Sequence, residues 1–554
     1  MNEATKIASQ TGTVAKLDAA EATVAALIAN GIDTLYALPG LHNDPLCDAA
    51  FKRKGEIRLL HARHEQGTAY MALGAALSTG KPQAFAAVPG PGFLNTTAAL
   101  LSAEGTCAPV LGLMGQIPQR DINRNLGHLH EIRDQIGMAA HVAKYARRIR
   151  SAHEAPRLVN EAIAAMISDR PGPAVLECAM DIWATRAPVA LTDAPATPAT
   201  YHIDAEGVER AARLAADARK PMIIVGGGAL EASAEVRQLA EFLQAPVLSY
   251  RRGRGVIPTD HPLAINLPQG HRLWSEVDLV IAIGTRLFMQ EQQWGMDKDL
   301  KVIRIDADPE APARHKAPDV ALIGDAAAYT GSLIAALEHS AERRAVCAFD
   351  LVAEAAWLTE RASRLEPQAA YLRAIRAALS ADGIFVDEVT QVGFASRLLF
   401  PVHTPRTFIS PGYQDNLGWG FGTALGVKAA NPDRQVVAIA GDGGFMYQVG
   451  ELATAVQHGI GLVVVVFDNG MFGNVKRIQQ ERYGNRIIAA DLSSPDFAAM
   501  AETYGVEGYR VATPDELERA LGLALEKNAP ALIHVKCGEM PSPWDMLLMP
   551  RVRG

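Results

Sequence analysis

Short apolar runs rich in β-branched residues alternate along this chain with longer, alanine-rich runs, and this alternation constrains the possible folds most. The β-branched runs have the length of a strand, and the alanine-rich runs repeat their apolar residues with helical spacing. Such alternation is typical of βαβ units, which build parallel sheets covered by helices. We therefore predict an α/β protein with three doubly wound parallel-sheet domains. The expected strands include 34–38, 84–88, 222–228, 246–250, 279–284, 302–306, 436–440 and 462–467.

The helical pattern is clearest in two places near the N-terminus. It predicts a helix over 14–30, closed by Gly31, and another around 65–79. A second α/β block is expected to open with a helix at 204–218.

Composition changes mark the expected domain boundaries. The stretch 184–203 is rich in Pro, Ala and Thr and is interpreted as a linker, and 337–366 as a helical or irregular connector. The predicted domains are 1–185, 200–338 and 366–554. Three blocks of similar size are consistent with an ancient repeat, although no short-period repeat is visible.

Composition and charge exclude several classes of protein. Of 554 residues, 49% are hydrophobic and 21% charged, which excludes disorder as the main state. The net charge of −8 argues against nucleic acid as a partner. Five cysteines without a CxxC motif argue against a disulfide scaffold or structural zinc. The first 13 residues lack the apolar region of a signal peptide, and the most apolar run, 462–467, is too short to span a bilayer. We expect a cytoplasmic protein without membrane attachment.

Oxygen-bearing side chains follow two of the expected strands. Gly441-Asp442-Gly443-Gly444 comes directly after one strand, and Asn469 comes after the next. Because ligands bind at the carboxyl ends of parallel strands, both side chains are candidate Mg²⁺ ligands beside a diphosphate. The glycines allow the main chain to approach a phosphate, and a helix is expected to start near Phe445. The alternative is an ordinary βα turn with an unrelated turn at Asn469.

The spacing favours the ligand interpretation. Twenty-five residues separate Gly443 from Asn469, which resembles the diphosphate-binding signature of thiamine-diphosphate enzymes. That family usually has Asn-Asn where this chain has Asp468-Asn469. The resemblance implies Asp442, Asn469 and the main-chain carbonyl of Met471 as metal ligands. It also implies cofactor contacts from Gly441, Asp442, Gly443, Gly444, Asn469, Met471 and Phe472.

Further motifs resemble the acetolactate-synthase branch of this family, in order along the chain. They are 37–40, 63–69, 89–92, 115–118, 255–262 and 417–422. The resemblance implies pyrimidine-binding, central and diphosphate-binding domains. It also implies a homodimer or a dimer of dimers, with sites at the subunit interface.

The same resemblance assigns roles around the cofactor rings. Glu65 is expected to bond a ring nitrogen of the aminopyrimidine and to work as an acid–base group, with Pro39 and Gly40 nearby. Leu417 is the expected support beneath the bent cofactor, and the carbonyl of Asp415 and the N–H of Leu417 are expected to bind the pyrimidine edge. Two alternatives remain open: a capping role for Glu65, and a metal site with His61 and His64, which lacks the HExxH pattern.

The segment expected on the substrate side of the cofactor departs from the acetolactate-synthase pattern at Leu41-His42. Simple pyruvate decarboxylases have an acid at the position of Leu41, so its absence argues against that activity. A histidine matching His42 occurs in benzaldehyde lyase, which suggests a proton shuttle, with a surface or capping histidine as the alternative. Gln116 matches a glutamine of the family's substrate pocket, and Phe93 is expected to narrow that pocket.

Other segments give weaker signals. His128 and His130 lie in a loop that is either near the site or simply solvated. Gly226–Gly228 follows a strand but lacks the full GxGxxG, and 266–274 and 284–289 depart from the pattern of FAD-binding relatives, so FAD is unlikely. Arg251–Arg254 is interpreted as a solvated loop, with an anion site as the alternative.

The resulting hypothesis is a thiamine-diphosphate- and Mg²⁺-dependent carboligase or lyase that makes or breaks a carbon–carbon bond next to a carbonyl. The catalytic candidates are Glu65, His42 and Gln116. The expected substrate is a small 2-oxo acid, acyloin or diketone. The alternatives are a decarboxylase of an unusual 2-oxo acid, a diketone hydrolase, an acetolactate synthase catalytic subunit, and a catalytically silent nucleotide-binding homologue.

Overall fold

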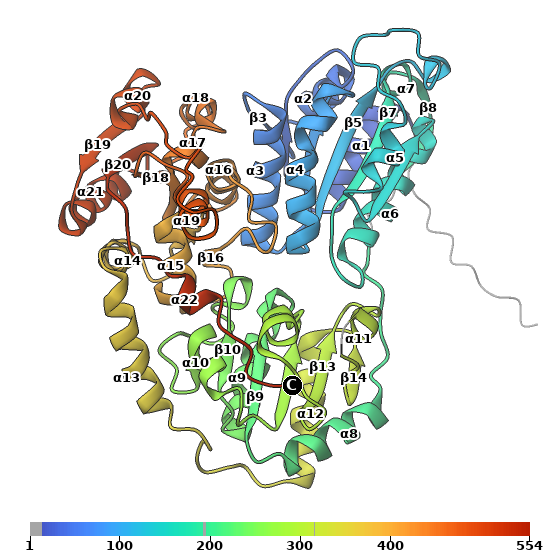
Figure 1. Cartoon of the computed structure of the whole chain (residues 1–554). Coiled ribbons are helices and arrows are strands. Elements are labelled where there is room, and N and C mark those ends of the chain that lie inside the picture. The colour runs from blue at the N-terminus through green and yellow to red at the C-terminus, as the bar shows by residue number, and fades with distance from the viewer. Residues whose placement is uncertain (1–13, 192–194, 315) are drawn as a thin grey trace, which may run out of the picture. The chain divides into compact units, whose positions relative to one another are not determined.

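The computed structural model describes residues 14–191, 195–314 and 316–554. The interpretation of the first 13 residues and part of the predicted linker therefore lie outside the described residues. The chain divides into two compact units, one ending at Ala199 and the other formed by 77–79 and 200–554. The described residues form three six-stranded parallel sheets and one two-stranded antiparallel ribbon, so the predicted α/β class is confirmed (Figure 1).

The first sheet has the strand order β3-β2-β4-β5-β7-β6. Helices pack on it, and every residue of β5 and β7 is buried, as expected for a parallel sheet covered on both faces. Its strands are β2 (Thr34–Ala37), β3 (Arg58–His61), β4 (Gln83–Ala87), β5 (Val110–Gln116), β6 (Tyr145–Ile149) and β7 (Ala174–Ala179). Its helices are α1 (Ala19–Ala29), α2 (Asp44–Lys52), α3 (Glu65–Thr79), α4 (Pro91–Thr106), α5 (Gln135–Ala139), α6 (Ala155–Ile167) and α7 (Met180–Trp183).

The second sheet has the order β11-β10-β9-β12-β13-β14 and belongs to the central domain. Numbered within the domain this order is 3-2-1-4-5-6, the arrangement of dinucleotide-binding folds. Its strands are β9 (Pro221–Val225), β10 (Val247–Ser249), β11 (Ala264–Ile265), β12 (Leu279–Ile283), β13 (Lys301–Asp306) and β14 (Val320–Ile323). Its helices are α8 (Ala205–Asp217), α9 (Ser233–Leu243), α10 (Leu267–Leu273), α11 (Ala311–Arg314) and α12 (Ala326–Ser340).

The third sheet has the order β16-β15-β17-β18-β20-β19. Its strands are β15 (Ile384–Val386), β16 (Phe408–Ile409), β17 (Val436–Gly441), β18 (Val463–Asp468), β19 (Glu507–Val511) and β20 (Ala531–Lys536). The helices of this part are α13 (Leu351–Ala362), α14 (Gln368–Ala378), α15 (Gln391–Leu399), α16 (Gly420–Ala430), α17 (Asp442–Phe445), α18 (Leu452–Gln457), α19 (Gly473–Arg482), α20 (Phe497–Thr503), α21 (Pro514–Lys527) and α22 (Trp544–Leu547).

The first and third sheets share one topology, 2-1-3-4-6-5 when strands are numbered within each domain, and the second sheet differs. The strand orders therefore support a repeat of the first and third domains, and the central domain, with its different order, adds no support for a threefold repeat.

Two predicted segments need correction. The expected helix over 14–30 begins only at Ala19, because Asp18 and Glu21 form a capping box there, and Val14–Asp18 is strand β1. Its partner is β8 (Arg186–Ala190), which lies inside the predicted linker and pairs with it in antiparallel register. No helix in the described part of the chain is long and apolar enough to cross a membrane.

Candidate active site

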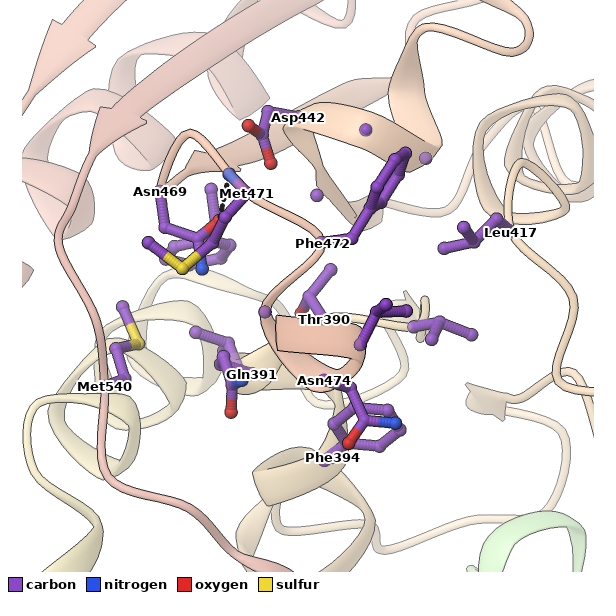
Figure 2. A pocket seen from close by; sticks show the side chains of 18 of the residues that line it. Thr390, Gln391, Phe394, Leu417, Asp442, Asn469, Met471, Phe472, Asn474 and Met540 are labelled. Carbon is purple, nitrogen blue, oxygen red and sulfur yellow. Dashed lines mark hydrogen bonds between the residues drawn. The ribbon is translucent and has the colours of Figure 1, made fainter. Parts of the chain in front are cut away.

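A cavity of about 210 Å³ opens at the carboxyl ends of the third sheet's strands (Figure 2). Its walls come from the turns after β15, β17 and β18 and from the segment after β20. Carboxyl ends of parallel strands are where ligands of such sheets bind. The lining includes Val389, Thr390, Gln391, Phe394, Leu417, Gly441, Asp442, Gly443, Gly444, Asn469, Met471, Phe472, Asn474, Cys537 and Met540.

Asp442 is the buried carboxylate of this cavity and is 3% exposed. The expected helix starts at Asp442 rather than near Phe445, and it is one turn long. Asp442 Oδ2 accepts hydrogen bonds from Ser494 Oγ at 2.9 Å and from the N–H of Gly470 at 3.1 Å. Burial raises the pKa of Asp442 despite these hydrogen bonds, so a nearby cation would favour its charged form.

The turn after β18 brings Asn469 and Met471 to the same cavity. Asn469 Oδ1 accepts the N–H of Met471 at 3.3 Å. Main-chain bonds from Phe472 to Ala490 and from Leu492 to Gly470 hold this turn in place. The structure thus brings Asp442, Asn469 and Met471 together. In the described residues no group of three or more His, Cys, Asp or Glu side chains is placed to hold a metal; the predicted set has one carboxylate, one amide and one main-chain carbonyl.

Asp468, where the chain departs from the usual Asn, is fully buried. Its Oδ2 accepts from Lys536 Nζ at 2.7 Å and lies 3.0 Å from His534 Nε2. Burial opposes its charge, but the hydrogen bonds from Lys536 and His534 hold the pKa of Asp468 below its ordinary value. The charge that this residue adds is therefore compensated by the protein itself.

The turn after β15 also lines the cavity, and sequence reasoning missed it. Thr390 caps α15 by accepting the N–H of Gly393 at 2.7 Å. Gln391 leaves its buried Oε1 without a partner among the described residues. A strand of three residues carries too little pattern to be detected, but the two acids that follow it, Asp387-Glu388, resemble the signal that revealed Asp442.

Glu388 and Asp387 are buried behind the cavity. Glu388 Oε2 accepts the N–H of Gly420 at 2.7 Å, and burial raises the pKa of Glu388 to about 8. Asp387 pairs with the buried Arg397 at 2.8 Å, and its carbonyl accepts Trp419 Nε1. Both acids therefore support the segment around Leu417.

Leu417 lines the cavity opposite Asn469 and Met471 (Figure 2). Two residues earlier, Asp415 accepts two hydrogen bonds from Arg397, at 2.7 and 2.9 Å.

The prediction that Arg251–Arg254 form a solvated loop is wrong. Arg254 is 5% exposed, because its guanidinium donates to the carbonyls of Ser396 and Phe400 at the C-terminal end of α15.

The N-terminal unit places Glu65 at the first position of α3, directly after β3. Its Oε2 accepts Asn95 Nδ2 at 3.0 Å, and a methyl group added at Gly92 would lie 3.4 Å from its Oε1. Pro39 and Gly40 follow β2 at the same end of this sheet. A methyl group at Gly40 or Gly92 would contact Val88, so Val88 packs between the two turns.

His42 is 2% exposed and lies against the main chain of Gly115. Its ring stacks on His130, with centroids 5.3 Å apart, so His130 packs inward, whereas His128 pairs with Asp121 at 3.2 Å. Burial lowers the pKa of His42, and His130 lowers it further. No described residue pairs with His42 Nδ1.

Gln116, at the end of β5, is also buried. Its Nε2 donates to Glu177 at 3.2 Å, and Gln135 donates to the same carboxylate at 2.9 Å. Gln135 Oε1 in turn accepts the N–H of Gly90, which carries the network to the turn after β4. Phe93 is fully buried in α4.

Comparisons with known proteins agree with this arrangement. The N-terminal TPP-binding, central and C-terminal TPP-binding domain models of thiamine pyrophosphate enzymes match 17–138, 208–333 and 388–535. The chain belongs to this family. A probable acetolactate synthase large subunit of Methanocaldococcus jannaschii is 30% identical over 563 residues, covering 93% of this chain and 91% of the relative. A probable 2-ketoarginine decarboxylase of Pseudomonas aeruginosa is 32% identical over 537 residues, covering 94% of each chain.

An Escherichia coli relative, the large subunit of acetolactate synthase isozyme 2, is 30% identical over 548 residues and covers 96% of this chain and 97% of its own length. Family membership confirms the predicted resemblance and with it the cofactor, thiamine diphosphate. The chain is an enzyme that makes or breaks a carbon–carbon bond next to a carbonyl group.

Proposed function

We propose that this enzyme is a Mg²⁺-dependent carboligase or lyase of a small 2-oxo acid, acyloin or diketone. The observation that carries the proposal is the cavity at the carboxyl ends of β17 and β18, where Asp442, Asn469 and Met471 converge beside Gly441–Gly444. One carboxylate and two neutral oxygens are ligands that suit Mg²⁺ and leave positions for diphosphate oxygens.

The residues of the cavity fit a magnesium diphosphate. The buried Asp442 has a raised pKa that a cation would lower, and the unpartnered Gln391 oxygen lies in the opposing wall. A flip of the Gln391 amide exchanges the positions of its O and N atoms, so the same side chain can present its NH₂ group to a phosphate. The glycine turn allows main-chain approach, and Cys537 and Met540 provide an apolar side.

We assign the ring end of the cofactor to Pro39, Gly40, Glu65, Asp415 and Leu417. Thiamine diphosphate supplies a nucleophilic carbon that adds to carbonyl groups. Glu65 would hold the pyrimidine ring and exchange a proton with its ring nitrogen. Asn95 orients the Glu65 carboxyl through its hydrogen bond to Oε2.

His42 and Gln116 are the proposed groups for the substrate. The lowered pKa of His42 keeps its ring neutral at physiological pH, so it can both accept and donate a proton. Gln116 is held by Glu177 and presents a fixed amide at the end of β5. The exposed Leu41 provides no acid at the position where simple pyruvate decarboxylases have one.

A second candidate is decarboxylation of a 2-oxo acid, because a relative 32% identical to this chain is a probable 2-ketoarginine decarboxylase. Wild-type enzyme should be incubated with cofactor, Mg²⁺ and panels of 2-oxo acids, acyloins and diketones. Carbon dioxide without a ligated product indicates the decarboxylase. A new or cleaved carbon–carbon bond indicates the carboligase or lyase.

Further proposals concern organisation. We retain the boundaries 1–185, 200–338 and 366–554, since each family match falls within one of them. A homodimer or dimer of dimers, such as a homotetramer, and a cytoplasmic location are proposed as for the family. We propose no FAD in the central domain, since the N–H groups of Gly226 and Gly228 already donate to the carbonyls of Ile283 and Gly284.

The acid–base role is tested with Glu65→Gln. This variant should fold and bind the cofactor but slow proton exchange at the thiazolium carbon by roughly 10²–10⁴-fold, because the ring nitrogen loses its acid. NMR of the bound cofactor in deuterated water measures the exchange. Glu161→Gln, an exposed change in the same unit, is the control. Wild-type exchange in Glu65→Gln would contradict the assignment.

A further inference from the structure

A network of four charged side chains connects the central domain to the turn that carries Leu417. Asp387 pairs with Arg397, which donates twice to Asp415, and Arg251 Nη2 donates to the same carboxylate at 2.9 Å. Arg251 also donates to the carbonyl of Gly412. Arg397 and Asp387 are at most 1% exposed, so this end of the network is shielded from water.

Both ends of the interdomain ion pair have unusual main-chain geometry. Arg251 has a φ of +48° and Asp415 a φ of +47°, which side-chain-bearing residues seldom adopt. Such conformations cost energy and persist where the surroundings impose them, most often at functional sites. Here the two residues pair with each other, and Asp415 is held by Arg397 as well.

The loop that carries Arg251 is itself firmly anchored. Gly253 packs so closely on β9 that an added methyl group would lie 2.4 Å from the carbonyl oxygen of Val225. Arg254 is buried and donates to the carbonyl of Ser396 at 2.7 Å. Arg251 therefore projects from a fixed base.

The turn that it contacts ends at the cavity. Leu417 lines the cavity, and Gly418 packs against Tyr447 with a φ of +78°. None of the described residues of the central domain lines the cavity. An effect of that domain on the cavity therefore passes through contacts such as Arg251–Asp415.

We infer that Arg251 is a positioning residue of the central domain, which holds the turn 412–417 so that Asp415 and Leu417 meet the ring portion of the cofactor. This inference rests on the proposed assignment of Asp415 and Leu417 to those rings. Arg251 is not placed to touch the diphosphate end, which is held by the turns after β17 and β18. Removal of the Arg251 side chain should therefore weaken binding of the ring portion of the cofactor more than binding of its diphosphate.

The test compares two ligands in Arg251→Met full-length protein with Mg²⁺ present. Thiamine diphosphate is titrated directly by tryptophan fluorescence, and inorganic diphosphate is titrated as its competitor. Thiamine diphosphate should bind about tenfold more weakly, because Asp415 and Leu417 are no longer held in place for the cofactor rings. Inorganic diphosphate should bind as in wild type. Arg251→Lys, which keeps the charge but loses the planar fork, should lie between wild type and Arg251→Met.

Glu231→Gln is the matched control, because it breaks the Arg406–Glu231 pair between the same two domains without touching the turn. Equal weakening of both ligands by Arg251→Met would indicate general damage and overturn the inference, as would no weakening of either. Failure of the wild type to bind thiamine diphosphate would instead remove the proposed function. Arg397 still pairs with Asp415 in the variant, so folding should be retained.

Discussion

Glu388 is a buried carboxyl group that forms no ion pair with a cation among the residues that the structure describes. Neighbouring Asp387 pairs with Arg397, whereas Glu388 accepts hydrogen bonds from the main-chain N–H groups of Val389 and Gly420. Burial is the main cause that raises its pKa to about 8, from an ordinary value of 4.5. The folded enzyme thus keeps a proton here that the unfolded chain releases at much lower pH.

This difference predicts how Glu388→Gln changes the pH dependence of stability. Between about pH 5 and 8 the native state binds more protons than the unfolded state, so wild-type stability should fall with rising pH, by at most about 1.4 kcal/mol per unit from this group. Glu388→Gln, which cannot ionise, should lose this slope. Urea unfolding of the cofactor-free protein across this range measures it.

The exposed Glu518→Gln serves as control for that measurement and should keep the wild-type slope. An unchanged slope in Glu388→Gln would show that Glu388 is ionised in the native state.

The positions of single site residues could be predicted where those residues belong to a motif with fixed spacing. Asp442 and Asn469 follow two strands at a distance that the sequence displays directly, and the structure places them in one cavity. Arg251 and Arg254 were not predictable, because an arginine in a glycine-containing loop is usually solvated. Their burial depends on acceptors 142 to 164 residues away.

At the scale of elements, long periodic segments were predicted well and short ones poorly. Helix α3 has the predicted bounds, and β12, β13 and β18 lie where apolar runs indicated strands. The ribbon of β1 and β8 was missed because each strand is stabilised by a partner about 170 residues away. Local pattern carries no information about such pairing.

The packing of helix α17 on the turn after β18 provides a prediction at this scale. A methyl group at Gly443 would lie 2.5 Å from the ring of Phe472. Gly443→Ala should therefore displace this ring, which lines the cavity, and weaken thiamine-diphosphate binding. The overpacking should also lower the stability of the protein by about 1–3 kcal/mol. Calorimetric titration and thermal unfolding measure the two effects.

Gly443→Ala/Phe472→Leu should recover binding, since the smaller side chain makes room for the methyl group. Gly522→Ala, where an added methyl group meets nothing within 4 Å, should leave binding unchanged. If the double variant binds no better than Gly443→Ala, the ring is not the cause.

For the whole molecule, the proposed assembly predicts complementation. Glu65 and Asp442 belong to different compact units, and the family resemblance implies that each site takes one from each of two chains. Asp442→Ala alone should lose the cofactor on desalting, because the diphosphate loses its metal. Mixed and refolded with Glu65→Gln, it should regain one active site per heterodimer, since both changes fall in the other site.

Differently tagged chains allow the heterodimer to be purified and its activity to be compared with both parent variants. Heterodimers without any recovered activity would mean that each site is built within one chain.

The equal topology of the first and third sheets has a further consequence. Corresponding strand ends carry different chemistry in the two domains. After the second strand, one domain has Glu65 and the other has the turn that leads to Leu417; after the third strand, one has Gly90–Gly92 and the other Gly441–Gly444. This pattern is consistent with duplication of one ancestral domain followed by divergence of the strand ends. Because neither domain carries the residues of the other, a chain that lacks either of them is expected to be inactive.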